Sequence, residues 1–303
     1  MAPICLLDPF VVAPRASGPL FVQVRDARNV AAVRDDRPPT AGGDDHRYHV
    51  RVSSAATPPV TDLGPLPVSR DGLAATGGTA SSFRFAAADG APLSLALTDL
   101  SLPAATFEPL AYATAAGGAA VLVVLEPPRG GSAAGWAFAH GAGGLVFAAD
   151  ALGSGGADFA YRLELRSLVA ATWGEPPVGN DTLATAQPVS WDAGDDGVVV
   201  LGSLDRTLPG GGPDALDVFR ATVGPDARLV AFTGPAGGAE PDTVLRLLAG
   251  DGTLLAENDD VPGAETLLSA AAATAGADGV VYVEISFWAA GARGAYALFV
   301  GVP

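Results

Sequence analysis

The chain has 303 residues, with 33 Asp and Glu against 17 Arg and no Lys, so its formal net charge at pH 7 is −16. This balance excludes nucleic acid as a partner, because a protein that neutralises phosphates needs a basic face. A single cysteine, Cys5, excludes an intrachain disulfide. The 39 Gly and 25 Pro residues punctuate short apolar runs, a pattern typical of β-sandwiches.

A strand-like segment that begins with Tyr occurs three times, at residues 48–52, 161–165 and 296–300. In the first two copies apolar residues alternate with charged or polar ones, which is the period of a half-buried strand. An apolar strand precedes each copy. These preceding strands are residues 20–24, 145–149 and 280–284.

The repeat predicts one partial copy at residues 1–52 and two full β-sandwiches at 60–168 and 175–303. Pro and Ala accumulate between them, at 53–59 and 169–177, and predict linkers. Because the first copy lacks its front half, either the chain is a fragment of a longer array or another surface completes the half-sandwich. The sequence leaves both alternatives open.

Three further stretches bear on whether the chain crosses a membrane and whether it carries an export signal. Residues 109–125 are uncharged but are broken by two glycines, so we expect two strands and a turn rather than a spanning helix. The Ala-rich residues 269–275 are compatible with one short helix. Residues 1–8 lack the basic start of a secretory signal, so an export signal is expected upstream of this chain. The acidic composition suits an extracellular, cell-surface or periplasmic setting.

The third copy carries several separated motifs in a fixed order, at residues 180–186, 202–204, 214–219, 245–260, 279–285 and 294–300. In this order it resembles the bacterial pre-peptidase C-terminal domain, the family that includes the collagen-binding domains of clostridial collagenases. The second copy resembles a degenerate member of that family, and residues 1–52 resemble only its tail.

The resemblance implies an all-β fold of tandem jelly-roll-like antiparallel β-sandwiches without catalytic residues, used by exported proteins for binding or targeting. In some members a calcium ion joins an Asn-Asp segment to an Asp-x-x-Asp segment, and the matching positions here are Asn180, Asp181, Asp214 and Asp217. Hard oxygen ligands from two segments suit calcium. The family's preceding glutamates are replaced by prolines and Val178. The alternative interpretation is turn and capping chemistry by the same side chains.

Other polar motifs are less specific. Residues 258–260 invite a metal site, but a turn between two strands explains them without metal. Residues 192–197 resemble the start of an EF-hand loop, yet the ligand count fails at later positions. His46, His49 and His140 have no spacing that pairs them with a nucleophile, so the sequence predicts no enzyme.

The aromatic residues suggest two roles. Trp288 follows a predicted strand and offers a stacking surface for a sugar ring or a peptide. The alternative is that Phe287 faces the core in phase with its strand and leaves Trp288 to cap the sandwich. The remaining three tryptophans are predicted in loops or linkers, where they pack module against module. They are Trp136, Trp173 and Trp191.

The sequence therefore predicts a non-catalytic, extracytoplasmic module that binds a protein or glycan surface. The alternative is a structural subunit of a surface layer, filament or scaffold, a homo-oligomer that assembles through its N-terminal half-repeat, residues 1–52.

Overall fold

The computed structural model describes residues 60–303 except for short stretches at 74–80, 103–108, 116–120, 129, 151–155, 157, 176–178, 205–214, 237–239, 262–265 and 290–291. The partial copy predicted at residues 1–52, and the assembly role given to it, lie outside the described residues. Among the residues described, no helix is long and apolar enough to cross a membrane.

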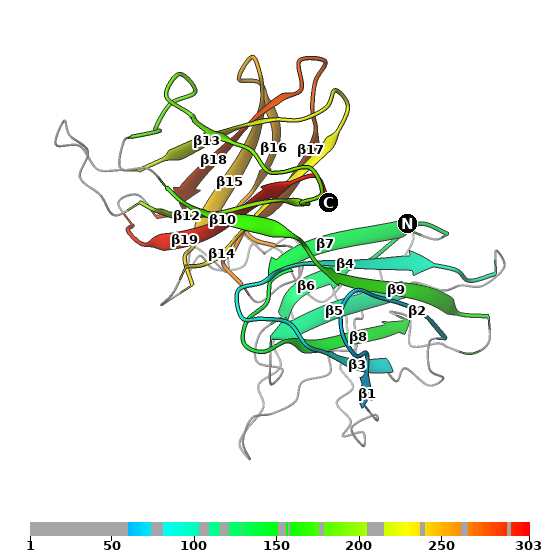
Figure 1. Cartoon of the computed structure of the whole chain (residues 1–303). Coiled ribbons are helices and arrows are strands. Elements are labelled where there is room, and N and C mark those ends of the chain that lie inside the picture. The colour runs from blue at the N-terminus through cyan, green and yellow to red at the C-terminus, as the bar shows by residue number, and fades with distance from the viewer. Residues whose placement is uncertain are drawn as a thin grey trace, which may run out of the picture. The chain divides into compact units, whose positions relative to one another are not determined.

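The first sandwich consists of two sheets packed face to face on an apolar core (Figure 1). One sheet has the order β1 (Val60–Asp62), β3 (Ser81–Phe85), β8 (Gly144–Asp150), β5 (Pro109–Ala115), β6 (Val121–Leu125). The other has the order β2 (Val68–Leu73), β9 (Ala160–Ser167), β4 (Pro92–Asp99), β7 (Ser132–Phe138).

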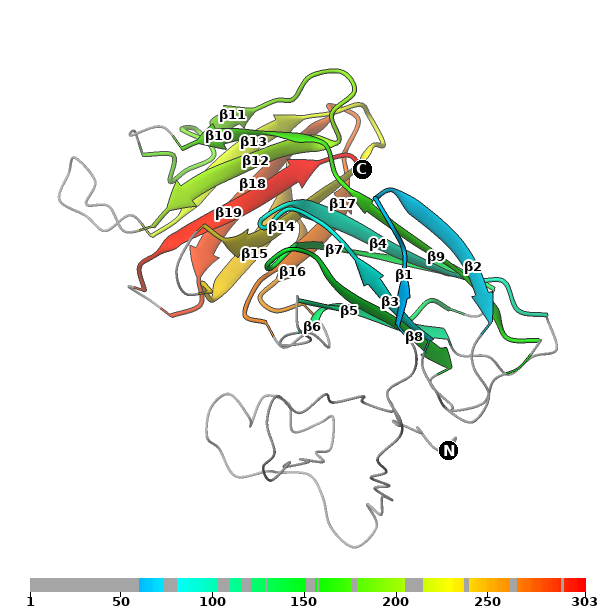
Figure 2. The same ribbon diagram turned by 60° about the horizontal axis from the view of Figure 1, so that its bottom comes forward.

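The second sandwich repeats this arrangement, as Figure 2 shows from another side. One sheet has the order β11 (Gln187–Val189), β13 (Asp217–Thr222), β18 (Val280–Phe287), β15 (Thr243–Ala249), β16 (Leu254–Asn258). The other has the order β10 (Ala170–Gly174), β12 (Gly197–Ser203), β19 (Ala295–Gly301), β14 (Arg228–Pro235), β17 (Ala270–Thr274).

Each sandwich contains the eight strands of a jelly roll in the same order. Strands β2 to β9 are distributed between the two sheets as strands β12 to β19 are, with matching neighbours throughout. The all-β, tandem, jelly-roll-like fold is therefore confirmed for the described residues. Strands β5 and β6 also confirm the two strands predicted within residues 109–125.

Three details differ from the predictions. Residues 170–174, predicted as part of a linker, form β10, because β12 offers them a free sheet edge. The short helix considered at 269–275 is wrong: Ala270–Thr274 is strand β17, paired with β14. The antiparallel pattern also ends at the edges, where β1, β10 and β11 each add a parallel strand.

The β2–β9–β4–β7 sheet of the first sandwich and the matching β10–β12–β19–β14–β17 sheet of the second differ in how much of the outer face is buried. Along β9, Tyr161, Leu163 and Leu165 are buried while Glu164 is exposed, so one face of the sheet meets solvent. Along β19 every residue from 296 to 301 is buried. A strand that is covered on both faces reads as a continuous apolar run.

The second face of β12, β14 and β19 is covered by residues of the first sandwich. Phe138 of β7 lies 5.0 Å from Phe232, and Phe232 stacks at 4.8 Å on Phe299 (ring centroids). Gly234 lies opposite Phe138, and an added Cβ at Gly234 would come 2.3 Å from that ring. The two jelly rolls therefore share an apolar cluster that we call the aromatic junction. Its buried members are Phe138, Leu168, Val199, Val230, Phe232, Ala297 and Phe299.

Asp196 fixes the chain where one sandwich passes into the next. Its carboxylate accepts hydrogen bonds from Arg166 Nη1 and from the Val169 amide, both at 2.8 Å. Its own amide donates to the Val169 carbonyl, and its carbonyl accepts from the Val302 amide. Asp196 thereby holds the end of β9, the start of β10 and the chain's last residues together.

We expect Phe232→Ala to destabilise the full chain by about 3–5 kcal/mol, because it opens a cavity where three aromatic rings meet. Thermal and urea unfolding measure the effect. The control Leu254→Ala removes an exposed leucine (53% exposed) and should stay within about 0.5 kcal/mol of the unmodified chain. Equal stability of the two variants would contradict a packed junction.

Candidate functional site

Asn180 joins the segment before β11 to the start of β13. Its carbonyl accepts a hydrogen bond from the Val218 amide at 2.8 Å, and its side-chain Nδ2 donates to the Val218 carbonyl at 3.2 Å. Asn180 is only 2% exposed. The amide group therefore acts as a strand partner for Val218 and brings Asn180 next to Asp217.

Asp217 is a fully buried carboxylate at the rim of the second core. Its Oδ2 accepts a hydrogen bond of 2.6 Å from the Tyr296 hydroxyl. The Tyr296 ring lies against Gly202 of the adjacent strand, where an added Cβ would meet the hydroxyl at 2.3 Å. A glycine at position 202 is what lets the tyrosine reach Asp217.

Of the four predicted calcium ligands, the structure places Asn180 and Asp217 at this rim, and Asp181 follows Asn180 in the chain. The Oδ1 atoms of Asn180 and Asp181 are buried and accept no hydrogen bond from the described residues. Buried oxygens of this kind, beside the Asp217 carboxylate, fit a hard cation. Asp214 lies outside the described residues. Within the described part of the chain, no three His, Cys, Asp or Glu side chains gather closely enough to hold a metal by themselves.

The first sandwich preserves the tyrosine but not the carboxylate. Tyr161 lies opposite Gly72 in the register in which Tyr296 lies opposite Gly202. The position that matches Asp217, at the start of β3, is Ser81. Burial raises the pKa of Tyr161, and the Ser81 hydroxyl and the charge of Arg70 oppose that rise. The first sandwich therefore lacks the buried carboxylate that the second sandwich has at this position.

The other polar motifs serve the fold. Asn258 donates to the Asp260 carbonyl at 2.7 Å and accepts from the Ala270 amide at 2.9 Å, so it closes a turn, as the metal-free interpretation predicts. Glu175 accepts from the Ser203 amide at 3.0 Å. His140 is exposed, while His46 and His49 lie outside the described residues.

The structure gives the positions of Phe287 and the four tryptophans, for which the sequence suggested stacking, capping or packing between modules. Phe287 packs on the second core, as the capping interpretation predicts, whereas Trp288 is 56% exposed, as a stacking surface requires. Trp136 contacts the aromatic junction, with the Arg228 guanidinium 5.4 Å from its ring centre. The expected loop or linker location is wrong for Trp136 and Trp173, which lie in β7 and β10. Trp173 and Trp191 pack on the second core and not between modules.

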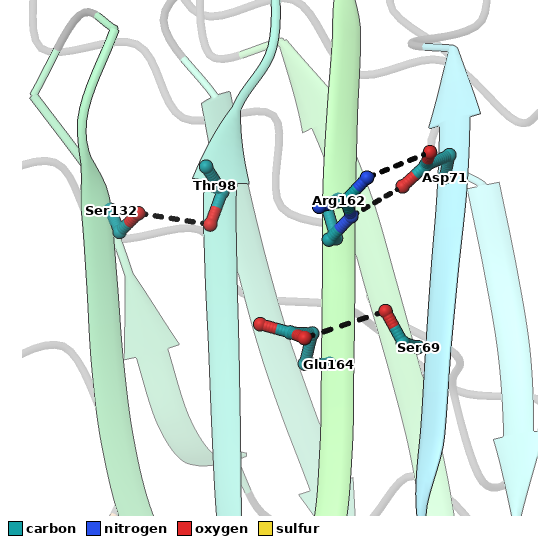
Figure 3. Close-up of polar contacts among 6 residues, drawn as sticks. All are labelled: Ser69, Asp71, Thr98, Ser132, Arg162 and Glu164. Atoms are coloured by element: carbon teal, nitrogen blue, oxygen red, sulfur yellow. Dashed lines mark hydrogen bonds and ion pairs between the residues drawn. The ribbon is translucent and has the colours of Figure 1, made fainter.

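A polar surface lies on the outer face of the sheet formed by β2, β9, β4 and β7, beyond the end at which Trp136 and Phe138 turn outward into the aromatic junction. Figure 3 shows cross-strand pairs on it: Arg162 with Asp71, Thr98 with Ser132 and Glu164 with Ser69. Small side chains occupy the positions between these pairs, at Ala96 and Ala134, which are register partners. We call this surface the open face.

Two charged side chains of the open face, Arg162 and Asp71, are held by an ion pair. The Arg162 guanidinium makes two hydrogen bonds to the Asp71 carboxylate, at 2.7 and 3.1 Å. The hydrogen bond with Arg162 lowers the pKa of Asp71, and the same contact raises the pKa of Arg162. Both groups stay charged through the neutral range, so the face presents both signs beside hydroxyl groups. Sequence alternation in β4 and β9 is the signal that could have located it.

No protein-family model and no curated protein matches the chain. Among solved structures, it is similar to the tandem CBM51 modules of a family 98 glycoside hydrolase from Streptococcus pneumoniae, at 11% identity over 77% of this chain and 83% of that one, with a TM-score of 0.25. It is also similar to the PBSX exported protein XepA, at 11% identity, 80% and 89% coverage and a TM-score of 0.27. The N-terminal CBM22 tandem domain of Paenibacillus barcinonensis Xyn10C gives 10% identity, 75% and 85% coverage and a TM-score of 0.24. Likenesses of this size carry no argument here, and the fold assignment rests on the strand pairing.

We expect Gly202→Ala to destabilise the second sandwich by about 1–3 kcal/mol, because the new methyl group pushes the Tyr296 ring away from Asp217. Gly174→Ala is the matched control, since an added Cβ there meets no atom within 4 Å. Thermal unfolding of both variants checks this. A neutral Gly202→Ala would mean that Tyr296 is not held against its neighbour.

Proposed function

We propose that the chain is a non-catalytic, extracytoplasmic binding or targeting module, related to the pre-peptidase C-terminal family, that attaches to a protein or glycan surface. The observation that carries the proposal is the open face: four paired strands with outward hydroxyl, carboxylate and guanidinium groups around small residues. A sheet face with small residues at Ala96 and Ala134, bordered by hydrogen-bonding groups, suits an extended partner better than a small substrate.

Comparison of the two sandwiches supports this use. The matching face of the second sandwich is covered by the aromatic junction, and its outward positions are apolar. On the open face the same positions are occupied by Arg162, Glu164 and Thr98, which are half-buried or exposed. The outer face of the first sandwich's sheet thus carries polar groups beyond the junction, where the matching face of the second sandwich stays apolar.

We expect Ala96→Arg to weaken attachment at least tenfold, because a long side chain at the centre of the open face holds a flat partner away. The measurement is co-sedimentation of the full chain with fibrillar collagen, peptidoglycan, chitin and cellulose, scored by apparent Kd. Thr222→Arg, at an exposed position of β13 in the second sandwich, is the matched control and should bind like the unmodified chain.

Two outcomes would count against the proposal. One is unchanged attachment of Ala96→Arg. The other is a chain that binds none of the four materials but forms a polymer by light scattering, which would favour the structural subunit.

We propose further that calcium occupies the rim formed by Asn180, Asp181 and Asp217, with Asp214 as the fourth ligand. The buried, unbonded oxygens of Asn180 and Asp181 support this. In this position the ion would tie the segment before β11 to β13 and act on stability, since no reaction chemistry accompanies it. With few carboxylates, we expect a dissociation constant in the range of about 10⁻⁴ to 10⁻³ M.

Calcium should therefore raise the melting temperature of the full chain after chelator treatment, with a stabilisation of about 2.7 kcal/mol when calcium is at 100 times its Kd. Asp181→Ala should remove most of this effect, whereas Asp158→Ala, an exposed carboxylate in the first sandwich, should keep it. Calorimetric titration gives the Kd directly. Equal calcium responses in both variants would assign the ion elsewhere.

A further inference from the structure

We propose that a depression at the end of β18, on the second sandwich, binds a neutral pyranose ring of a glycan. The depression has a volume of about 400 Å³ and is lined by residues of β15, β16 and β18, with Trp288 at its edge. Pockets for small ligands commonly measure about 300–1,000 Å³. The proposal gives the binding module a ligand class and a second site away from the open face.

Strand geometry fixes Trp288 on the outer side. Ile285 is buried and Phe287 packs on the core, so the alternate residues Glu284, Ser286 and Trp288 turn outward. The Trp288 amide donates to the Asp242 carbonyl at 3.0 Å, which extends the β15–β18 pairing by one step and fixes the backbone beneath the indole. The indole is 56% exposed and so offers a flat apolar surface to the C–H face of a sugar.

Polar groups stand beside this aromatic surface. Arg246 lies between Glu257 and Glu284 in cross-strand register. Its Nε donates to Glu257 at 2.5 Å, and this hydrogen bond, together with the charges of Glu257 and Glu284, raises the pKa of Arg246. The contact uses one of the five N–H groups of the guanidinium, so others remain for ligand oxygens. The Arg246 guanidinium and the Glu257 carboxylate, which hold each other in place, can hydrogen-bond to two adjacent hydroxyls of a sugar.

Charge decides which sugars fit. Among the residues that line the depression, Arg246 is the cation and Glu257 and Asp259 are the acids, with Glu284 opposite Arg246 on the next strand. The whole chain carries a net charge of −16. Uronic acids and sulfated glycans would be repelled by this field. A peptide with basic side chains would be attracted by it, but an exposed indole with paired hydrogen-bonding groups at its edge matches a neutral ring better. We therefore assign the depression to neutral pyranoses.

Affinity electrophoresis of the full chain tests the assignment, in gels that contain hydroxyethylcellulose, galactomannan, xylan or, as the acidic comparison, polygalacturonate. At least one neutral polysaccharide should retard the chain. Trp288→Ala should weaken that retardation about tenfold or more, which corresponds to about 1.4 kcal/mol, because an aromatic ring that stacks on the ligand is a typical binding hot spot. Trp288→Phe should keep part of it. Leu254→Ala, which removes an exposed leucine from β16 of the same sheet, should change nothing.

Retardation by polygalacturonate alone, or equal retardation of Trp288→Ala and the unmodified chain, overturns the assignment. So does the absence of retardation in every gel. The inference rests on the proposed function, and comparison with the Ala96→Arg variant separates the pyranose site from the binding module as a whole. If Ala96→Arg loses attachment and Trp288→Ala keeps it, the binding module stands and the pyranose site fails. If the unmodified chain attaches to no material in either assay, both fail.

Discussion

Burial of both faces of the β12–β19–β14 sheet is the constraint on which the rest of the described structure depends. One face packs on the second core, and the other receives Phe138 and Leu168 of the first sandwich. Because positions covered on both sides favour apolar side chains, every residue of β19 from 296 to 301 is buried and uncharged. The junction makes one unit of two jelly rolls, and Asp196 fixes the short connection between them with hydrogen bonds to Arg166 and Val169.

The junction also determines which surfaces are left for function. It covers the outer face of the β12–β19–β14 sheet and, in the first sandwich, the end of the β2–β9–β4–β7 sheet that carries Phe138 and Leu168, so only the rest of that outer face meets solvent with polar side chains. Duplicated domains that share a topology can diverge in this way because outward strand positions do not touch their own core, and a change there alters the partner without altering the fold. The depression beside Trp288 lies on the other sheet of the second sandwich, where the same freedom applies.

At the rim of the second core, stability and ligand chemistry use the same atoms. Tyr296 passes over Gly202 to reach the buried Asp217 carboxylate, and Asn180 joins the neighbouring residue, Val218, as a strand would. The first sandwich keeps the tyrosine and glycine, with Ser81 at the carboxylate position. The Gly–Tyr contact therefore belongs to the jelly roll itself, whereas the carboxylate is an addition made in one copy.

The sequence by itself determined the all-β class and the repeated strands at 145–149, 161–165, 280–284 and 296–300, because alternation and continuity of apolar residues are local properties that survive in any tertiary context. Residues 161–165 alternate and 296–300 do not, and the structure gives one open face and one covered face accordingly. Only the tertiary structure decided which edges pair and which distant side chains meet. The sequence of residues 170–174 is typical of a linker, but these residues form a strand because β12 offers a free edge. Asn180 pairs with Val218, which lies 38 residues further along the chain. Such contacts depend on strand order and register, which are set by packing of the whole sandwich and leave no mark in the local sequence.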